Sequence, residues 1–140
     1  MLDDNDIELV DINGNTAFCI AAAAGNIEIV DLMLKRNPIL PIKRGGNGNT
    51  PIQYAALQGR CKMTWHLYDE TIHCFAEKDW GLLFFACIYT GIYGKYYKSV
   101  FKSIQRVSPR SLNVVSQRID FVIQKGLTAQ LIAHLHFIHV

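Results

Sequence analysis

The chain has 140 residues, of which 50% are hydrophobic and 19% are charged, and its formal net charge is +2. This composition is typical of a single folded domain and argues against intrinsic disorder. The small net charge, with Lys and Arg scattered along the chain, argues against a nucleic-acid-binding surface. The longest uncharged run, residues 80–94, is interrupted by three glycines. It is shorter than the roughly 20 residues that a membrane-spanning helix needs.

The N-terminus is acidic and lacks the basic and apolar regions of a secretory signal. The cysteines are therefore predicted to be reduced, mostly buried thiols: Cys19, Cys61, Cys74 and Cys87. No pair of Cys or His residues has the spacing that closes a zinc site. The glycine-rich run 45–48 is followed by neither Lys-Ser nor Lys-Thr, so it does not match a phosphate-binding loop. We expect no enzymatic activity, no cofactor and no metal.

Two segments, residues 14–25 and 48–59, align without a gap at a period of 34 residues. Each begins with Gly-Asn-Thr, which predicts a turn followed by a helix start. In the second segment Thr50 is expected to cap the helix and Pro51 to occupy its first position. Paired alanines favour close helix packing, and Gly25 and Gly59 are expected to end the helices in a left-handed conformation.

A second helix is expected in each unit. In the first unit, residues spaced along one helix face precede a stop at Asn37-Pro38: Ile29, Val30, Met33 and Leu34. The second unit has a weaker stripe: Met63, Thr64, Leu67 and Tyr68.

A third unit around residues 82–91 has lost the Thr and Pro of its turn. The next predicted helix has an amphipathic stripe and ends at Ser108-Pro109: Tyr93, Tyr96, Tyr97, Val100, Phe101 and Ile104. Residues 110–125 form a long connection or a modified helix, and residues 126–133 hold the trace of a fourth unit.

These units resemble the ankyrin repeat, whose pattern is G-x-T-P-L-H-x-A-A, then G-H-x-E-I-V, then L-L. The first unit matches it in register at Gly14, Thr16, Ala21, Ala22, Gly25, Glu28, Ile29, Val30 and Leu34. The second matches at Gly48, Thr50, Pro51, Ala55, Ala56, Gly59 and Leu67. In the family the usual His ties neighbouring turns together. Cys19 stands at that position and is a weak donor, so the first unit is expected to be less rigid.

The resemblance implies an all-α solenoid of stacked helix-turn-helix units. We divide the chain into an acidic segment (1–10), two repeats (11–44 and 45–76), a degenerate third repeat (77–109), and an irregular connection with a partial fourth repeat (110–140).

A narrower resemblance, over roughly residues 11–135, is to plant ankyrin-repeat proteins with a C-terminal PGG membrane domain. It rests on runs such as residues 65–68, 77–79 and 86–90.

That narrower resemblance implies a cytosolic location, at the plasma membrane in a full-length parent, and a role in stress and defence signalling. No PGG motif and no transmembrane helices are found, so the chain is expected to be the repeat portion alone or a truncated product. Two functions stay open: a free binding module, or the cytosolic portion of a membrane-anchored signalling protein.

The ankyrin resemblance also implies a non-catalytic protein–protein interaction through a concave face. The expected partner is another protein, with no nucleic acid and no small-molecule substrate. Membrane association would come only from a region beyond the chain. The positions that usually face partners are three in each turn and the two before the helix-ending Gly. Here these are Ile12, Asn13, Asn15, Ala23, Ala24, Gly46, Asn47, Asn49, Leu57, Gln58, Lys78, Asp79, Gly81, Tyr89 and Thr90.

Overall fold

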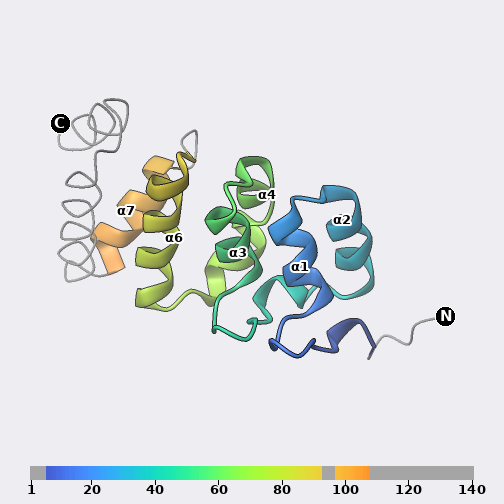
Figure 1. Ribbon diagram of the computed structural model, residues 1–140. Helices are drawn as coiled ribbons and strands as arrows, with labels where there is room; N and C mark the ends of the chain where they lie inside the picture. Colours follow the sequence, from blue (N-terminus) through green and yellow to red (C-terminus); the bar gives the residue numbers. More distant parts are fainter. Residues whose placement is uncertain (1–5, 93–96, 108–140) are drawn as a thin grey trace. The chain divides into compact units, whose positions relative to one another are not determined.

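The computed structural model describes residues 6–92 and 97–107, and in these residues it contains helices, turns and no named strand (Figure 1). The chain divides into two compact units, one up to Phe75 and the other from Ala76 onward. The first unit contains η1 (Asp6–Glu8), α1 (Ala17–Ala24), α2 (Ile27–Arg36), η2 (Leu40–Ile42), α3 (Pro51–Leu57), α4 (Cys61–His66), α5 (Tyr68–Thr71) and η3 (Ile72–Cys74). The second contains α6 (Glu77–Thr90) and α7 (Tyr97–Val107). The predicted all-α class is confirmed.

Helix α1 begins and ends where the sequence pattern predicts. The hydroxyl of Thr16 accepts a hydrogen bond from the backbone N–H of Cys19 at 3.2 Å, which satisfies a free donor of the first turn. Gly25 closes the helix with a left-handed φ of 76°. Phe18 and Ala22 are completely buried, so this short helix is fixed by packing as well as by its caps.

Helix α3 begins with Pro51 at its first position, as predicted, but its cap differs from the expected one. Thr50 and Gln53 are arranged as a capping box, but the Thr50 hydroxyl itself makes no hydrogen bond. Instead the Gln53 side chain turns back, and its Oε1 atom accepts the N–H of Thr50 at 2.8 Å. Gln53 occupies the position where the repeat pattern has His, and its longer flexible amide can reach the helix start. Gly59 has the predicted left-handed φ of 70°, one residue after the capping Gln58.

Helices α1 and α3 pack side by side within the first unit (Figure 1). Each contributes a pair of buried alanines to its core: Ala21 and Ala22 from α1, and Ala55 and Ala56 from α3. Side chains this small let two backbones approach closely, so one repeat can stack on the next without a large side chain between them.

Helix α2 is capped at its start by Asn26, whose Oδ1 accepts the N–H of Ile29 at 3.1 Å, and it ends at Asn37 as predicted. Its apolar stripe is less buried than expected. Val30 is completely buried and Met33 is half-buried, but the Ile29 side chain is exposed. Ile29 is exposed because no described element covers that side of the first repeat.

The stripe that looked weaker in the sequence is the better buried one. All four of its members lie in the core: Met63, Thr64, Leu67 and Tyr68. Burial of Thr64 is inexpensive because its hydroxyl donates to the backbone oxygen of Arg60 at 2.8 Å. The buried Thr71 makes the same bond to the oxygen of Leu67 at 2.8 Å, next to the interruption between α4 and α5.

In the second unit the structure overturns the turn expected at residues 77–81. Helix α6 already starts at Glu77 and runs to Thr90, and Gly91 ends it with a left-handed φ of 74° as predicted. Asp79 is buried, and its carboxylate accepts the N–H of Ala76 at 2.8 Å. The Thr and Pro that would start the helix later are missing, and this carboxylate satisfies a free donor one turn earlier.

Helix α7 follows the predicted amphipathic stripe, since Val100 and Ile104 are completely buried. The ring of Phe101 packs on Phe84 of α6, with ring centroids 5.6 Å apart. Several predicted features lie outside the described residues: Tyr93, Tyr96, the side chain of Tyr97, the stop at Ser108-Pro109, and the segment 110–140 with its partial fourth repeat.

Candidate protein-interaction surface

The first turn, residues 11–15, is held by a single carboxylate. Oδ1 of Asp11 accepts hydrogen bonds from the backbone N–H groups of Asn13 and Asn15, each at 2.9 Å. The N–H of Gly14 donates to the backbone oxygen of Asp11 at 3.0 Å, which closes the turn. The side chain of Ile12 at its tip is fully exposed. An apolar side chain is thus presented to solvent by a backbone with few degrees of freedom.

The second turn, residues 45–49, repeats this backbone pattern 34 residues later. The N–H of Gly45 donates to the oxygen of Asn49, and the N–H of Gly48 to the oxygen of Gly45, both at 2.9 Å. Gly45 replaces the aspartate of the first turn, so no carboxylate holds this turn at the equivalent position. The first turn holds it instead, because Oδ1 of Asn15 accepts the N–H of Gly46 at 3.1 Å.

Asn15 was predicted to contact a partner, and the structure gives its side chain another task. Its Oδ1 accepts from Gly46 and also from the hydroxyl of Tyr54 at 2.9 Å. A carbonyl oxygen with two hydrogen bonds has used both of its lone pairs. This oxygen therefore joins the two repeats and is not available to a partner.

Two further contacts join the same two repeats, and a third lies within the first repeat. The Cys19 thiol lies 3.8 Å from the backbone oxygen of Lys43, the long contact expected of a weak sulfur donor. Nε of Arg60 donates to the backbone oxygen of Ala23 at 3.1 Å. On the second helices, Nε2 of His66 lies 2.6 Å from Oδ1 of Asp31. The thiol at the family's His position thus contacts its own repeat, while Arg60 and His66 reach across to the first repeat from the second.

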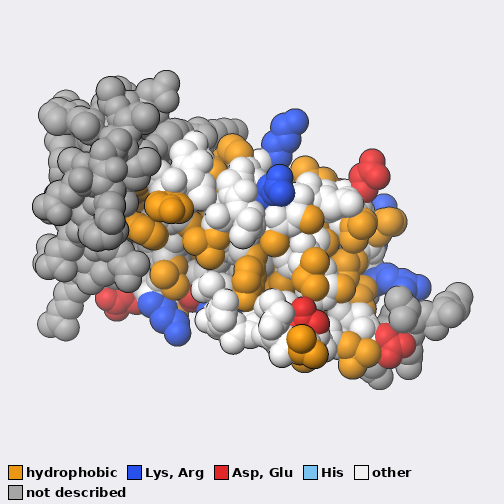
Figure 2. All heavy atoms as spheres, in the orientation of Figure 1, with side chains coloured by type: hydrophobic (Ala, Val, Ile, Leu, Met, Phe, Trp, Pro, Cys, Tyr) orange, Lys and Arg blue, Asp and Glu red, His pale blue; other side chains and the backbone are white. Residues whose placement is uncertain are grey.

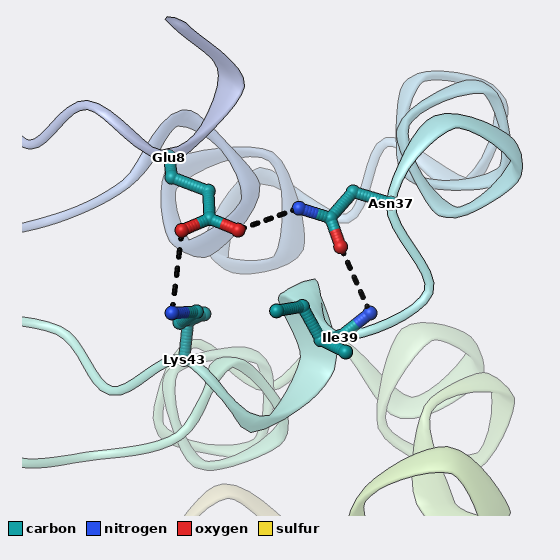
Figure 3. A network of polar contacts seen from close by, with 4 residues as sticks. All are labelled: Glu8, Asn37, Ile39 and Lys43. Atoms are coloured by element: carbon teal, nitrogen blue, oxygen red, sulfur yellow. Dashed lines mark hydrogen bonds and ion pairs between the residues drawn. The ribbon is translucent and has the colours of Figure 1, made fainter. Parts of the chain in front are cut away.

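A polar network joins Glu8 of η1 to Asn37 after α2 and to Lys43 after η2 (Figure 3). Oε1 of Glu8 accepts from Nδ2 of Asn37 at 2.7 Å, and Oε2 of Glu8 pairs with Nζ of Lys43 at 3.2 Å. Oδ1 of Asn37 in turn accepts the N–H of Ile39 at 3.1 Å. The hydrogen bond from Asn37, and then that from Lys43, hold the pKa of Glu8 below its usual value of 4.5.

The predicted site residues fall into three groups. The exposed group contains Ile12, Asn13, Ala24, Gly46, Asn47, Leu57, Gln58, Lys78 and Tyr89. The half-buried group contains Asn15, Ala23, Asn49, Gly81 and Thr90, and Asp79 is buried. Asp79 and Gly81 were wrong as turn residues because α6 includes both. The Thr90 hydroxyl donates to the backbone oxygen of Ala86 at 2.7 Å, which occupies its donor hydrogen.

Ten of these positions belong to the first unit and lie on its turns and at the ends of α1 and α3. Apart from half-buried Asn15 and Asn49, eight remain, and we call these eight the turn surface: Ile12, Asn13, Ala23, Ala24, Gly46, Asn47, Leu57 and Gln58. None of them carries a charge. Figure 2 shows hydrophobic and uncharged side chains over α1 and α3 on the face in view. Leu57, the last residue of α3, remains 43% exposed and supplies a second apolar side chain to this surface.

Comparison with known proteins identifies the repeating unit. A family model described as ankyrin repeats (three copies) matches residues 1–78. The chain belongs to the ankyrin-repeat family. No curated protein and no solved structure matches it. Ankyrin repeats are generally non-catalytic modules that bind other proteins. The match covers both predicted full repeats of this chain and concerns the repeats alone, so it does not extend to the plant membrane branch.

The cysteines of these ankyrin repeats differ from the expected picture. Cys19 and Cys87 are buried, but Cys74 is half-buried and Cys61 is exposed, so the expectation of mostly buried thiols was wrong for half of them. None forms a disulfide. Burial raises the pKa of the Cys19 thiol above its usual value of 9.0, which disfavours the nucleophilic thiolate.

Within the described part of the chain, no three His, Cys, Asp or Glu side chains gather as metal ligands would. His134, His136 and His139 fall outside that part. Among the helices that the structure describes, none combines the length and apolar character needed to cross a bilayer.

Sequence reasoning missed the residues that join the ankyrin repeats. Tyr54 and His66 both reach back to the first repeat, as does Arg60. The 34-residue period contained a signal for two of them, because Tyr54 aligns with Ile20 and His66 with Leu32. A polar or aromatic group at a position that is aliphatic in the neighbouring repeat indicates a specific partner across the interface.

Proposed function

We propose that this chain is a non-catalytic binding module that captures another protein through the turn surface. The observation that carries the proposal is that these residues are largely exposed and uncharged. The two turns that present many of them are joined by the hydrogen bond from Gly46 to Asn15. Ile12 and Leu57 are exposed, although water favours their burial. Asn13, Asn47 and Gln58 add exposed amide groups that can donate and accept hydrogen bonds.

The chemistry of the turn surface defines the kind of partner. The eight residues of the turn surface are uncharged, and the charges next to them, Asp11 and Arg60, already bond to Asn13 and Ala23. The affinity should therefore depend weakly on salt concentration. Apolar anchors surrounded by polar groups are the usual anatomy of a protein–protein interface. We therefore infer a partner that presents an apolar segment flanked by backbone or amide groups.

The test compares a double variant, Ile12→Asp with Leu57→Asp, against the control Leu82→Asp. Leu82 lies on α6 outside the turn surface, and it is 41% exposed where Leu57 is 43% exposed. The full chain serves as bait in extract of the source tissue, and the proteins retained by each variant are quantified. A partner captured by the wild type and the control is then purified, and its affinity is measured by calorimetry. We expect the double variant to bind it at least ~10-fold more weakly. An unchanged affinity would remove the turn surface from consideration.

A narrower proposal places the module on the cytosolic side of a membrane-anchored plant signalling protein acting in stress and defence. Its support is the sequence resemblance over residues 11–135. Reading the parent transcript beyond Val140 tests it, since encoded transmembrane helices would favour this role. A stop codon, together with a stable purified domain, would favour the free module.

A further inference from the structure

The period of 34 residues relates each side chain of the second repeat to one of the first. Tyr54 and His66 of the second repeat reach back to Asn15 and Asp31 of the first. The equivalents of Tyr54 and His66, 34 residues earlier, are Ile20 and Leu32. Because the two repeats share their backbone pattern, Ile20 and Leu32 lie on the side of the first repeat that faces away from the second.

This side of the first repeat is apolar and uncovered. Leu32 is 63% exposed, Ile20 is 51% exposed and Ile29 is 45% exposed. Met63 is the equivalent of Ile29 in the second repeat, where it is only 1% exposed. The same position is therefore in the core of one repeat and in solvent in the other. We call the side formed by Ile20, Ile29 and Leu32 the open side.

Two of the four charged residues of α2 are arranged symmetrically about Leu32; the other two are Asp31, which pairs with His66, and exposed Lys35. Glu28 lies four residues before Leu32, Arg36 lies four residues after it, and both are exposed. Residues four apart share a face of a helix, so Glu28, Leu32 and Arg36 form one stripe. The stripe reads acidic, apolar, basic along the helix, with opposite charges at equal distances from its centre.

We propose that the open side binds a second copy of the same chain, with the two α2 helices antiparallel and a two-fold axis at Leu32. In that arrangement Leu32 meets Leu32, and Glu28 of each copy faces Arg36 of the other. A two-fold interface must be complementary to itself. The charges of Glu28 and Arg36 meet this condition, because each faces the opposite charge in the other copy. Antiparallel helices also oppose their dipoles favourably.

Binding to a different protein would not require the charges of the stripe to be complementary to those of a second, antiparallel copy. This self-complementarity therefore favours a second copy of the chain as the partner. The apolar centre contains few side chains, so the interface is small and the dimer dissociates on dilution. The open side and the turn surface share no residue, and neither Ile12 nor Leu57 belongs to the open side.

Sedimentation velocity of the full chain over a range of concentrations tests the proposal. The wild type is expected to pass from monomer to dimer as its concentration rises. Leu32→Glu places a carboxylate at the axis and should weaken the dimer at least ~10-fold, since like charges meet there without water. The single variants E28R and R36E should each be weakened as well, because each brings like charges together.

The decisive experiment mixes the two charge variants, E28R and R36E. In a mixture of E28R with R36E, every facing pair has opposite charges again, so a heterodimer should form although each variant alone stays monomeric. The double variant E28R/R36E should regain dimerisation by itself. Circular dichroism and urea unfolding verify that each variant is folded, and Leu57→Asp should dimerise like the wild type.

A wild type that stays monomeric at all concentrations would overturn the proposal. So would a dimer that persists in folded Leu32→Glu, or a mixture that associates no better than its separate components. In any of these cases the open side is not a self-association surface.

Discussion

The hydroxyl of Tyr54 donates a hydrogen bond to Oδ1 of Asn15 at 2.9 Å, across 39 residues of sequence. The same oxygen accepts the N–H of Gly46, so one side-chain atom joins a helix and a turn of the second repeat to a turn of the first. The two turns therefore depend on each other, and a change in one should be measurable in the stability of both.

Tyr54→Phe should lower the free energy of unfolding by about 1 kcal/mol, because it removes one partly buried hydrogen bond and leaves the ring in place. Urea unfolding monitored by circular dichroism measures the change. The matched control is Tyr89→Phe, since Tyr89 is exposed and should change stability by less than about 0.5 kcal/mol. Equal effects of the two substitutions would show that the bond to Asn15 contributes nothing specific.

Gly46→Ala should destabilise the first unit by about 1–3 kcal/mol for a steric reason. A Cβ atom at Gly46 would lie 1.6 Å from the backbone oxygen of Asn13, so the two turns would have to separate. Gly48 is the contrasting position, because a Cβ there meets nothing within 4 Å but the residue has a left-handed φ of 77°. Gly48→Ala should cost about 1–2 kcal/mol through backbone strain alone.

Substitution by asparagine separates these two causes. Asn tolerates the left-handed conformation better than Ala does, so Gly48→Asn should be less destabilising than Gly48→Ala. Gly46→Asn should be at least as destabilising as Gly46→Ala, because a Cβ is present in both. Denaturant midpoints of the four variants give the comparison, and the opposite order at Gly46 would contradict a steric origin.

The network around Glu8 predicts a dependence of stability on pH. The pKa of Glu8 is lowered from 4.5 in the folded state, so its ionised form favours folding. This stabilisation is present above pH 4.5 and is lost as the pH falls through the lower, folded-state pKa. At about pH 6, Glu8→Gln should therefore be less stable than the wild type, and the difference should close in acid well below pH 4.5. A difference that stays constant between the two conditions would show that ionisation of Glu8 is not involved.

The pKa of Glu8 can also be measured directly by carbon-detected NMR titration. Asn37→Ala should raise it toward 4.5, since the hydrogen bond from Asn37 is the largest cause of its lowering. Lys43→Met should also raise the pKa, because it removes both a hydrogen bond and a positive charge from Glu8. A pKa left unchanged by Asn37→Ala would show that the bond from Asn37 does not lower it.

Alkylation should distinguish the cysteines by burial. Iodoacetamide at about pH 8 should modify exposed Cys61 in the folded protein, while buried Cys19 and Cys87 react at least ~10-fold more slowly. The raised pKa of Cys19 lowers its thiolate fraction further. Peptide mass spectrometry follows each site, and all should react at similar rates in urea. Rapid modification of Cys19 in the folded protein would contradict its burial.

The sequence predicted those parts of the fold that depend on local chemistry. Thr16, Gly25 and Pro51 each act through their own backbone or the next few residues, so a motif is enough to place them. The longer α6 was missed because its start depends on the carboxylate of Asp79, not on the Thr-Pro pair that opens α3. The pattern Ala76-x-x-Asp79 was available but is weaker than a Thr cap.

The candidate interaction surface was harder to predict than the fold, because exposure depends on neighbours that are distant in sequence. Ile12 lies at a turn tip as predicted, whereas the sequence did not show that Oδ1 of Asn15 accepts hydrogen bonds from Tyr54 and Gly46. The stripe through Met63 and Thr64 looked weak because Thr counts as polar in a sequence. Once its hydroxyl bonds to Arg60, Thr64 packs like an apolar residue.

The contacts between the first two repeats lie in three separate places: at the turns, at the ends of the first helices and on the second helices. Three ties that do not lie together resist rotation of one repeat on the other about any axis. A partner would therefore meet a surface whose shape exists before it arrives. The loss of conformational entropy on binding would then come mainly from the partner, and even a modest contact area could give a specific complex.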